Sequence, residues 1–161
     1  MSHWIPTEDD NRDAIRLLLS GLSTDVRMFE LEEEAFHLHR KNNTFPGEVY
    51  MRLGADSLDL AGATREMPVL YEGLIKTHLS DRKFRGRERS RIQYAAHLSA
   101  ALRGGLEPDM FDDEIWRYGD DYWRYALYAV VALIRASAAH SGVPVAQFAA
   151  ELAHRHGITL H

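Results

Sequence analysis

The chain lacks cysteine altogether among its 161 residues. Disulfides, thiolate zinc sites and cysteine nucleophiles are therefore excluded, and a reducing cytosol is the compartment that fits this composition. The first residues also lack a basic segment followed by an apolar run, so we expect no secretory signal. A cytoplasmic location is the resulting prediction.

Long hydrophobic runs and excess positive charge are lacking as well. The longest apolar run, residues 125–134, lies between Arg124 and Arg135 and is far shorter than the roughly 20 residues that a bilayer requires. We therefore expect no membrane association. The net charge of −5 argues against general binding to a phosphate backbone, so nucleic acid is not an expected partner.

The composition that remains is that of a folded domain, with 45% hydrophobic and 27% charged residues. The length fits one hydrophobic core. We find no internal repeat and no linker rich in proline, glycine or serine. The sequence therefore predicts a single domain over residues 1–161.

Apolar residues recur with helical spacing along nearly the whole chain, and strict alternation is rare. This pattern predicts an all-α fold, a compact bundle of about seven helices. The expected helices begin after Thr7, near Asp25, after Pro46, at Pro68, near Ser90, near Asp112, near Asp121 and at Pro144. Glycines at 142 and 157 are expected to end the last two.

The central helix of this bundle is expected at Asp121–Ala139, where side chains are hydrophobic almost all round. Such a helix must be covered on several sides. One side is lined by Trp123, Leu127, Val130 and Ile134, and another by Ala129, Ala132, Leu133 and Ala136.

The second expected helix, residues 25–41, carries polar groups on its inner face. A wheel at about 100° per residue places Glu32 and His39 near the middle of the apolar arc. A carboxylate in a core must be paired, protonated or bound to metal, because burying it bare costs several kcal/mol. The arc itself comprises Met28, Phe29, Leu31, Ala35, Phe36 and Leu38.

The expected partners of these groups lie on the central helix. The predicted polar core network is Glu32, His39, Arg124, Tyr128 and Arg135. Three interpretations stay open: a structural network, a ligand or catalytic site, and an oligomer contact. For a catalytic site, the candidate residues are Glu32, Glu33 and His39.

Two Glu-x-x-His pairs, Glu34 with His37 and Glu151 with His154, have the spacing that holds metal in four-helix di-iron proteins. Metal ligands in a bundle must face its core. Both pairs fall on the side of their helix away from the apolar residues. The sequence therefore predicts exposed pairs and no metal site there.

A basic run at residues 81–91 contains six cationic side chains in eleven residues. Arginines beside a helix start can bind a phosphate, because guanidinium groups and unpaired amides both point toward the anion. A solvated surface is the alternative interpretation. The candidate anion-binding residues are Arg82, Lys83, Arg85, Arg87 and Arg91.

Part of the chain is similar to all-α nucleotide pyrophosphohydrolases, in which a Glu-x-x-Glu helix and a later Glu-x-x-Asp pair hold Mg²⁺ on a triphosphate. Glu30 and Glu33 reproduce the first spacing, and the long helix before residues 141–144 has a similar layout. Arg117 and Tyr118 stand where the glutamate of the second pair belongs, so that pair is missing. The resemblance implies a reaction class and no more.

The function expected from the sequence is that of a non-catalytic module that binds a partner or associates with itself, because no complete catalytic set is present. A homodimer and a small phosphorylated ligand are the expected partners. The alternative is a Mg²⁺-dependent hydrolase of nucleotides or phosphate esters that uses acidic residues of the second helix. The sequence leaves the question of enzymatic activity open.

Overall fold

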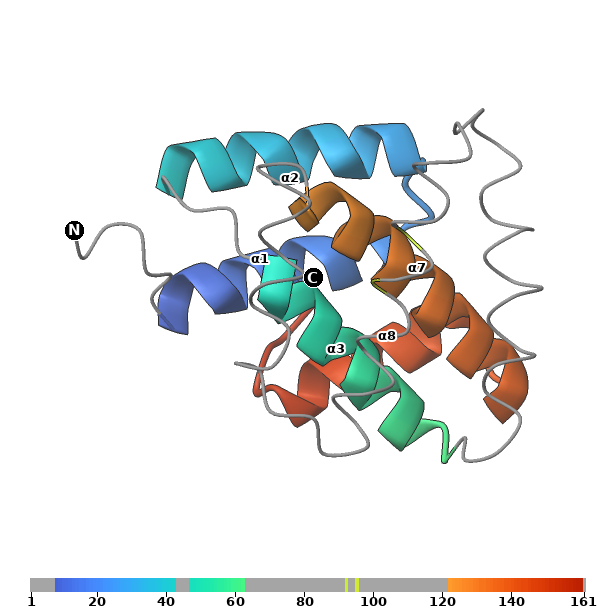
Figure 1. The fold of residues 1–161 in the computed structure, drawn as a ribbon. Helices are drawn as coiled ribbons and strands as arrows, with labels where there is room; N and C mark the ends of the chain where they lie inside the picture. Colours follow the sequence, from blue (N-terminus) through green and yellow to red (C-terminus); the bar gives the residue numbers. More distant parts are fainter. Residues whose placement is uncertain (1–7, 43–46, 63–91, 93–94, 96–121, 161) are drawn as a thin grey trace.

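The computed structural model describes residues 8–42, 47–62, 92, 95 and 122–160 (Figure 1). All regular structure in these residues is α-helical, which confirms the predicted all-α class. Their helices are α1 (Glu8–Ser23), α2 (Met28–Asn42), α3 (Gly47–Leu60), α7 (Tyr122–Ser141) and α8 (Val145–Arg155).

The helices expected from Pro68, Ser90 and Asp112 lie outside the described residues, apart from two positions. Ile92 and Ala95 are helical and buried, with 0% and 3% of their surface exposed. The count of about seven helices and the single domain over the whole chain stay predictions.

Helix α7 is buried along nearly its whole length. Between residues 123 and 138, every position is buried except Arg124 and Arg135, which are partly buried. Its bounds, Tyr122–Ser141, lie within two residues of the predicted central helix. Among the residues described, no single helix is long and apolar enough to cross a membrane, and α7 and α8 reach that length only as a pair bent by 108°.

Two hydrophobic clusters cover different sides of α7. One joins it to α1, α2, α3 and α8, and includes the four residues predicted for its first side. The other packs Ala129, Ala132 and Leu133 against Leu58, Ile92 and other buried residues. The two-sided burial of this helix therefore follows the sequence pattern.

The second helix was predicted to begin near Asp25, but α2 begins at Met28. The turn between α1 and α2 explains this difference. Asp25 has a φ of 55°, and the Val26 amide donates a hydrogen bond of 3.0 Å to the Gly21 carbonyl. This left-handed ending of α1 extends through Val26, so the next helix cannot begin inside it. Figure 1 shows α1 and α2 side by side, with α2 along one edge of the molecule.

The predicted glycine endings of α7 and α8 are confirmed. Gly142 and Gly157 have φ values of 71° and 65°, which side chains with a Cβ rarely adopt. The amides that follow them turn back to the helix, from Val143 to the Ala138 carbonyl and from Ile158 to the Ala153 carbonyl. Pro144 then occupies the N-cap position of α8.

The end of α8 is held against α1 and α3 by polar contacts. Arg155 Nη1 lies 3.1 Å from Asp59 Oδ2, and His156 Nε2 lies 3.0 Å from Asp56 Oδ2. Arg12 Nη2 donates a hydrogen bond of 3.0 Å to the Gly157 carbonyl. Exposed pairs of this kind contribute little stability each, so their main effect is to orient the C-terminal segment.

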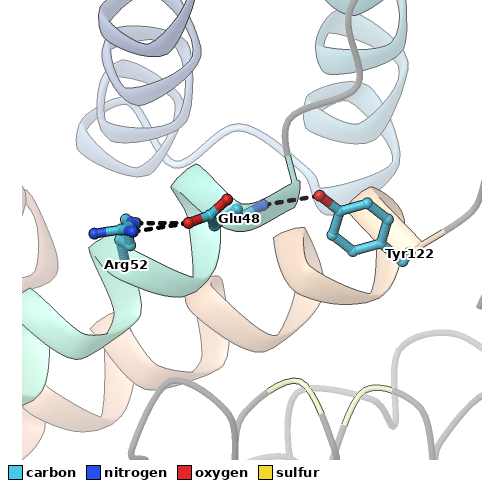
Figure 2. A network of polar contacts seen from close by, with 3 residues as sticks. All are labelled: Glu48, Arg52 and Tyr122. Carbon is cyan, nitrogen blue, oxygen red and sulfur yellow. Dashed lines mark hydrogen bonds and ion pairs between the residues drawn. The ribbon is translucent and has the colours of Figure 1, made fainter. Parts of the chain in front are cut away.

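A close approach at Gly47 joins the starts of α3 and α7, which run side by side in the same direction (Figure 1). A Cβ at Gly47 would lie 2.7 Å from Cδ2 of Tyr122 and closer still to Cε2. The Glu48 amide donates a hydrogen bond of 3.1 Å to the Tyr122 hydroxyl, which satisfies one of the first amides of α3. Figure 2 shows this contact beside the bonds from Arg52 Nε and Nη2 to Glu48 Oε1, at 3.0 and 2.8 Å.

We predict that Gly47→Ala destabilises the protein by about 1–3 kcal/mol, because the added methyl forces the Tyr122 ring away from α3. Glycine-to-alanine changes in helices usually stabilise, so the sign is diagnostic. Denaturant unfolding measures the change. Adding Tyr122→Ala to Gly47→Ala should cost less than the sum of the two single changes, whereas additive losses would contradict the proposed clash.

Candidate functional site

Glu32 is the polar group that joins α2 to α7. Its side chain is 14% exposed, and its Oε1 forms an ion pair with Arg124 Nε. The Tyr128 hydroxyl donates a hydrogen bond to Glu32 Oε2. Because Arg124 and Tyr128 are four residues apart, they lie on the same face of α7 and meet the two oxygens of one carboxylate. The structure thus brings together three members of the predicted network.

The ion pair is partly shielded from solvent, with 23% of the Arg124 side chain exposed. The Nε atom lies at ion-pair distance from Glu32 but outside hydrogen-bonding geometry. A charge in this position is costly without its partner, because the surrounding helices shield it from the water that would solvate it. The Glu32–Arg124 contact is therefore a strong constraint on where α2 lies.

His39 occupies a different environment from Glu32. It is buried, 1% exposed, and its Nε2 lies 2.8 Å from the Tyr50 hydroxyl of α3. Its ring also meets the Trp123 ring edge to face, with centroids 5.3 Å apart. The sequence analysis paired His39 with the arginines and Tyr128 of α7 and missed Tyr50. A signal was present, because Tyr50 lies in the apolar face of its helix and a buried hydroxyl requires a partner.

Burial keeps both members of this hydrogen-bonded pair neutral. It lowers the pKa of His39 from its usual 6.5 to about 4. It also raises the pKa of Tyr50 above its usual 10.0. Near neutral pH the pair is therefore an uncharged imidazole and an uncharged phenol, which share one hydrogen bond without an ion.

Glu33 and Arg135, the other members of the predicted sets, lie apart from these contacts. The Glu33 side chain is 59% exposed and lies 3.9 Å from His37, a surface pair with i,i+4 spacing. Arg135 is partly buried on α7, about 16 Å along the helix axis from Arg124. The three candidate catalytic residues therefore occupy a shielded ion pair (Glu32), the solvent (Glu33) and the core (His39).

Both Glu-x-x-His pairs are exposed, as the helical wheel predicted: Glu34 with His37, and Glu151 with His154. Within the described ranges, no three His, Asp or Glu residues are placed to hold a metal ion. The candidate anion-binding residues Arg82, Lys83, Arg85, Arg87 and Arg91 lie outside those ranges, so phosphate binding stays a prediction.

Phe29 and Phe36 correct the predicted inner arc of α2, because they are exposed by 67% and 40%. The buried residues of this helix are Leu31, Ala35 and His39, a narrow stripe with a spacing of four. The phenylalanines lie about 100° around the helix from that stripe. The Phe36 ring also stacks on the buried Trp123 ring, with centroids 6.3 Å apart.

Comparison of the chain with protein-family models, with curated proteins and with solved structures gave no match. The interpretation of these contacts therefore rests on their own chemistry.

We predict that Glu32→Gln lowers the free energy of unfolding by about 2 kcal/mol, because it leaves the Arg124 guanidinium shielded and without its counter-ion. Glu33→Gln, one residue along and exposed, should change it by less than about 0.5 kcal/mol. Urea unfolding of both variants measures the difference. Equal effects of the two substitutions would show that the Glu32 ion pair stabilises the fold no more than an exposed carboxylate does.

We predict an acid-dependent loss of stability that originates at His39. Its folded pKa of about 4 lies below its unfolded value of 6.5, so its contribution is complete above pH 6.5 and is lost as pH falls toward 4. The full loss corresponds to roughly 3 kcal/mol. Unfolding free energies at pH 7 and pH 4.5 should differ less in His39→Gln than in the wild type. His37→Gln, an exposed histidine on the same helix, should retain the wild-type difference.

Proposed function

We propose that the chain is a non-catalytic helical module that acts by associating with a second copy of itself. The observation that carries this proposal is that α2 uses its shielded polar groups in contacts within the fold and leaves a large apolar side chain exposed. Its shielded polar groups are engaged in holding the fold, Glu32 with Arg124 and Tyr128, and His39 with Tyr50. The same helix exposes Phe29 to solvent by 67%.

Exposed phenylalanine favours binding over catalysis at this helix. Aromatic residues are enriched at the centres of protein interfaces, where they bury a large area at low entropic cost. A single exposed apolar residue is ordinary, but Phe29 and Phe36 follow each other at seven residues and so lie on one stripe of α2. Helix α2 packs on the core through Leu31, Ala35 and His39, and Phe36 adds a stacked contact with Trp123.

The proposed architecture of the module is the predicted bundle of about seven helices around α7. Burial of Ile92 and Ala95 against Tyr125, Tyr128 and Ala129 supports a covering helix at residues 90–103. In this arrangement α7 supplies the rigid centre. Helix α2 lies at the edge and has an outward face available to a partner.

The test combines sedimentation velocity over a range of protein concentrations with a thermal-shift screen of Mg²⁺ and nucleotides. We expect the weight-average mass to rise with concentration, and we expect no saturable change in melting temperature with the nucleotides. The hydrolase alternative predicts the opposite result: a monomer whose melting temperature rises with Mg²⁺ and a nucleotide, with loss of that rise in Glu33→Gln. That outcome would contradict self-association and support the hydrolase.

A further inference from the structure

The outward face of α2 changes charge along its length. Its first half presents three exposed carboxylates, Glu30, Glu33 and Glu34. Its last turns present the exposed cations Arg40 and Lys41. The helix is therefore acidic at one end and basic at the other, which is the distribution that complements itself when one copy is reversed against another.

Four exposed residues form a continuous stripe on this face. Phe29, Glu33, Phe36 and Arg40 are spaced by four, three and four residues, the alternation that keeps side chains on one side of a helix. The stripe lies about 120° around α2 from the buried residues Leu31, Ala35 and His39 taken together. It therefore joins two exposed aromatic rings to both signs of charge, and one of these rings, Phe36, also stacks on Trp123 of the core.

We infer that this stripe is a homodimer interface in which α2 packs antiparallel against α2 of a second copy across a twofold axis. The inference rests on the proposed function and specifies its surface and geometry. In this register Phe29 lies opposite Arg40 of the second copy, and Glu33 lies opposite Phe36. A twofold axis repeats each contact, so a single surface satisfies both copies.

The antiparallel direction follows from the charges. It places Glu30 and Glu33 of one copy near Arg40 and Lys41 of the other, twice. It also allows the Arg40 guanidinium to lie over the exposed Phe29 ring, a favourable cation–π arrangement. A parallel pair would instead place carboxylate against carboxylate at one end and cation against cation at the other, which is repulsive.

The area of the surface sets the expected affinity of the dimer. One helix of 15 residues from each copy forms an interface at the small end of the range, below about 1,200 Å² in total. We therefore expect a weak, reversible dimer with a dissociation constant between about 10 µM and 1 mM. Because charged pairs contribute, the dimer should weaken further as salt rises.

The experiment reverses the charge of each half of α2 separately in the full chain. The acidic variant carries Arg40→Glu and Lys41→Glu, and the basic variant carries Glu30→Lys and Glu33→Lys. Each alone should dissociate at least about tenfold more readily than the wild type in sedimentation equilibrium. An equimolar mixture of the two should recover association, because every like-charge contact becomes an opposite-charge contact.

Two matched variants complete the design. Glu151→Lys, an exposed charge change on α8, should leave association unchanged. Phe29→Ser removes the most exposed ring without altering charge, and should also weaken association about tenfold. Phe29→Ser keeps the inference testable where a charge-reversed chain does not fold, as judged by circular dichroism.

Cysteine cross-linking tests the direction, since the chain has no cysteine of its own. A mixture of Glu30→Cys and Arg40→Cys chains should form disulfide-linked heterodimers. Either chain alone should not, because in the antiparallel register two cysteines at residue 30 are about 13 Å apart along the axis. Cross-linking of each chain with itself would instead establish a parallel pair and overturn the antiparallel geometry.

The outcomes separate this inference from the proposed function. A wild-type chain that stays monomeric to about 1 mM overturns the proposed self-association, and the inference with it. A wild-type dimer that all α2 variants leave unchanged retains self-association but places the interface elsewhere. Association that is lost in each charge-reversed chain, lost in Phe29→Ser and recovered in the mixture is the result we expect.

Discussion

The arrangement of the described residues depends on one constraint: α7 has almost no side that can face water. From residue 123 to residue 138 it is buried, with only Arg124 and Arg135 partly in reach of solvent. Neighbouring helices must therefore cover it all round. Helix α3 does so at the closest range, because Gly47 lets its backbone pass directly beside the Tyr122 ring. Helix α2 is fixed by Glu32, since the Arg124 charge requires a counter-ion at that height.

The two polar contacts of α2 show two solutions to burying polar groups next to an apolar helix. Glu32 remains at the shielded margin, 14% exposed, beside Arg124, whose positive charge offsets its own. His39 lies deeper and avoids a charge altogether, because burial lowers its pKa to about 4 and the Tyr50 hydroxyl satisfies its Nε2. Depth thus determines which solution applies. The ion pair persists where solvent is near, and the neutral hydrogen bond where it is not.

The sequence predicted features that depend on local rules and, of the contacts between helices, those of Glu32 with Arg124 and Tyr128. Helix α7 and the glycine endings at 142 and 157 follow from periodicity and backbone sterics, and the structure confirms them. The left-handed Asp25 was missed because that conformation is usually filled by glycine. The Tyr50 partner of His39 was missed because the sequence pattern does not show which neighbouring helix, α3 or α7, lies against His39. Phe29 was assigned to the core because a wheel shows which residues share a side, but not how many sides the bundle covers.

The core and the solvent impose different requirements on the residues of α2. Folding requires its buried stripe and the Glu32 carboxylate, whereas Phe29 and Arg40 are exposed. An apolar ring in water gains nothing for the monomer, and an ordered change from acidic to basic residues along the same face adds little beyond its fit to the helix dipole. In the proposed dimer, a second, reversed copy of this face would bury the ring and pair the opposite charges. One face of α2 is therefore determined by the core, and the other is the face that we assign to the proposed association.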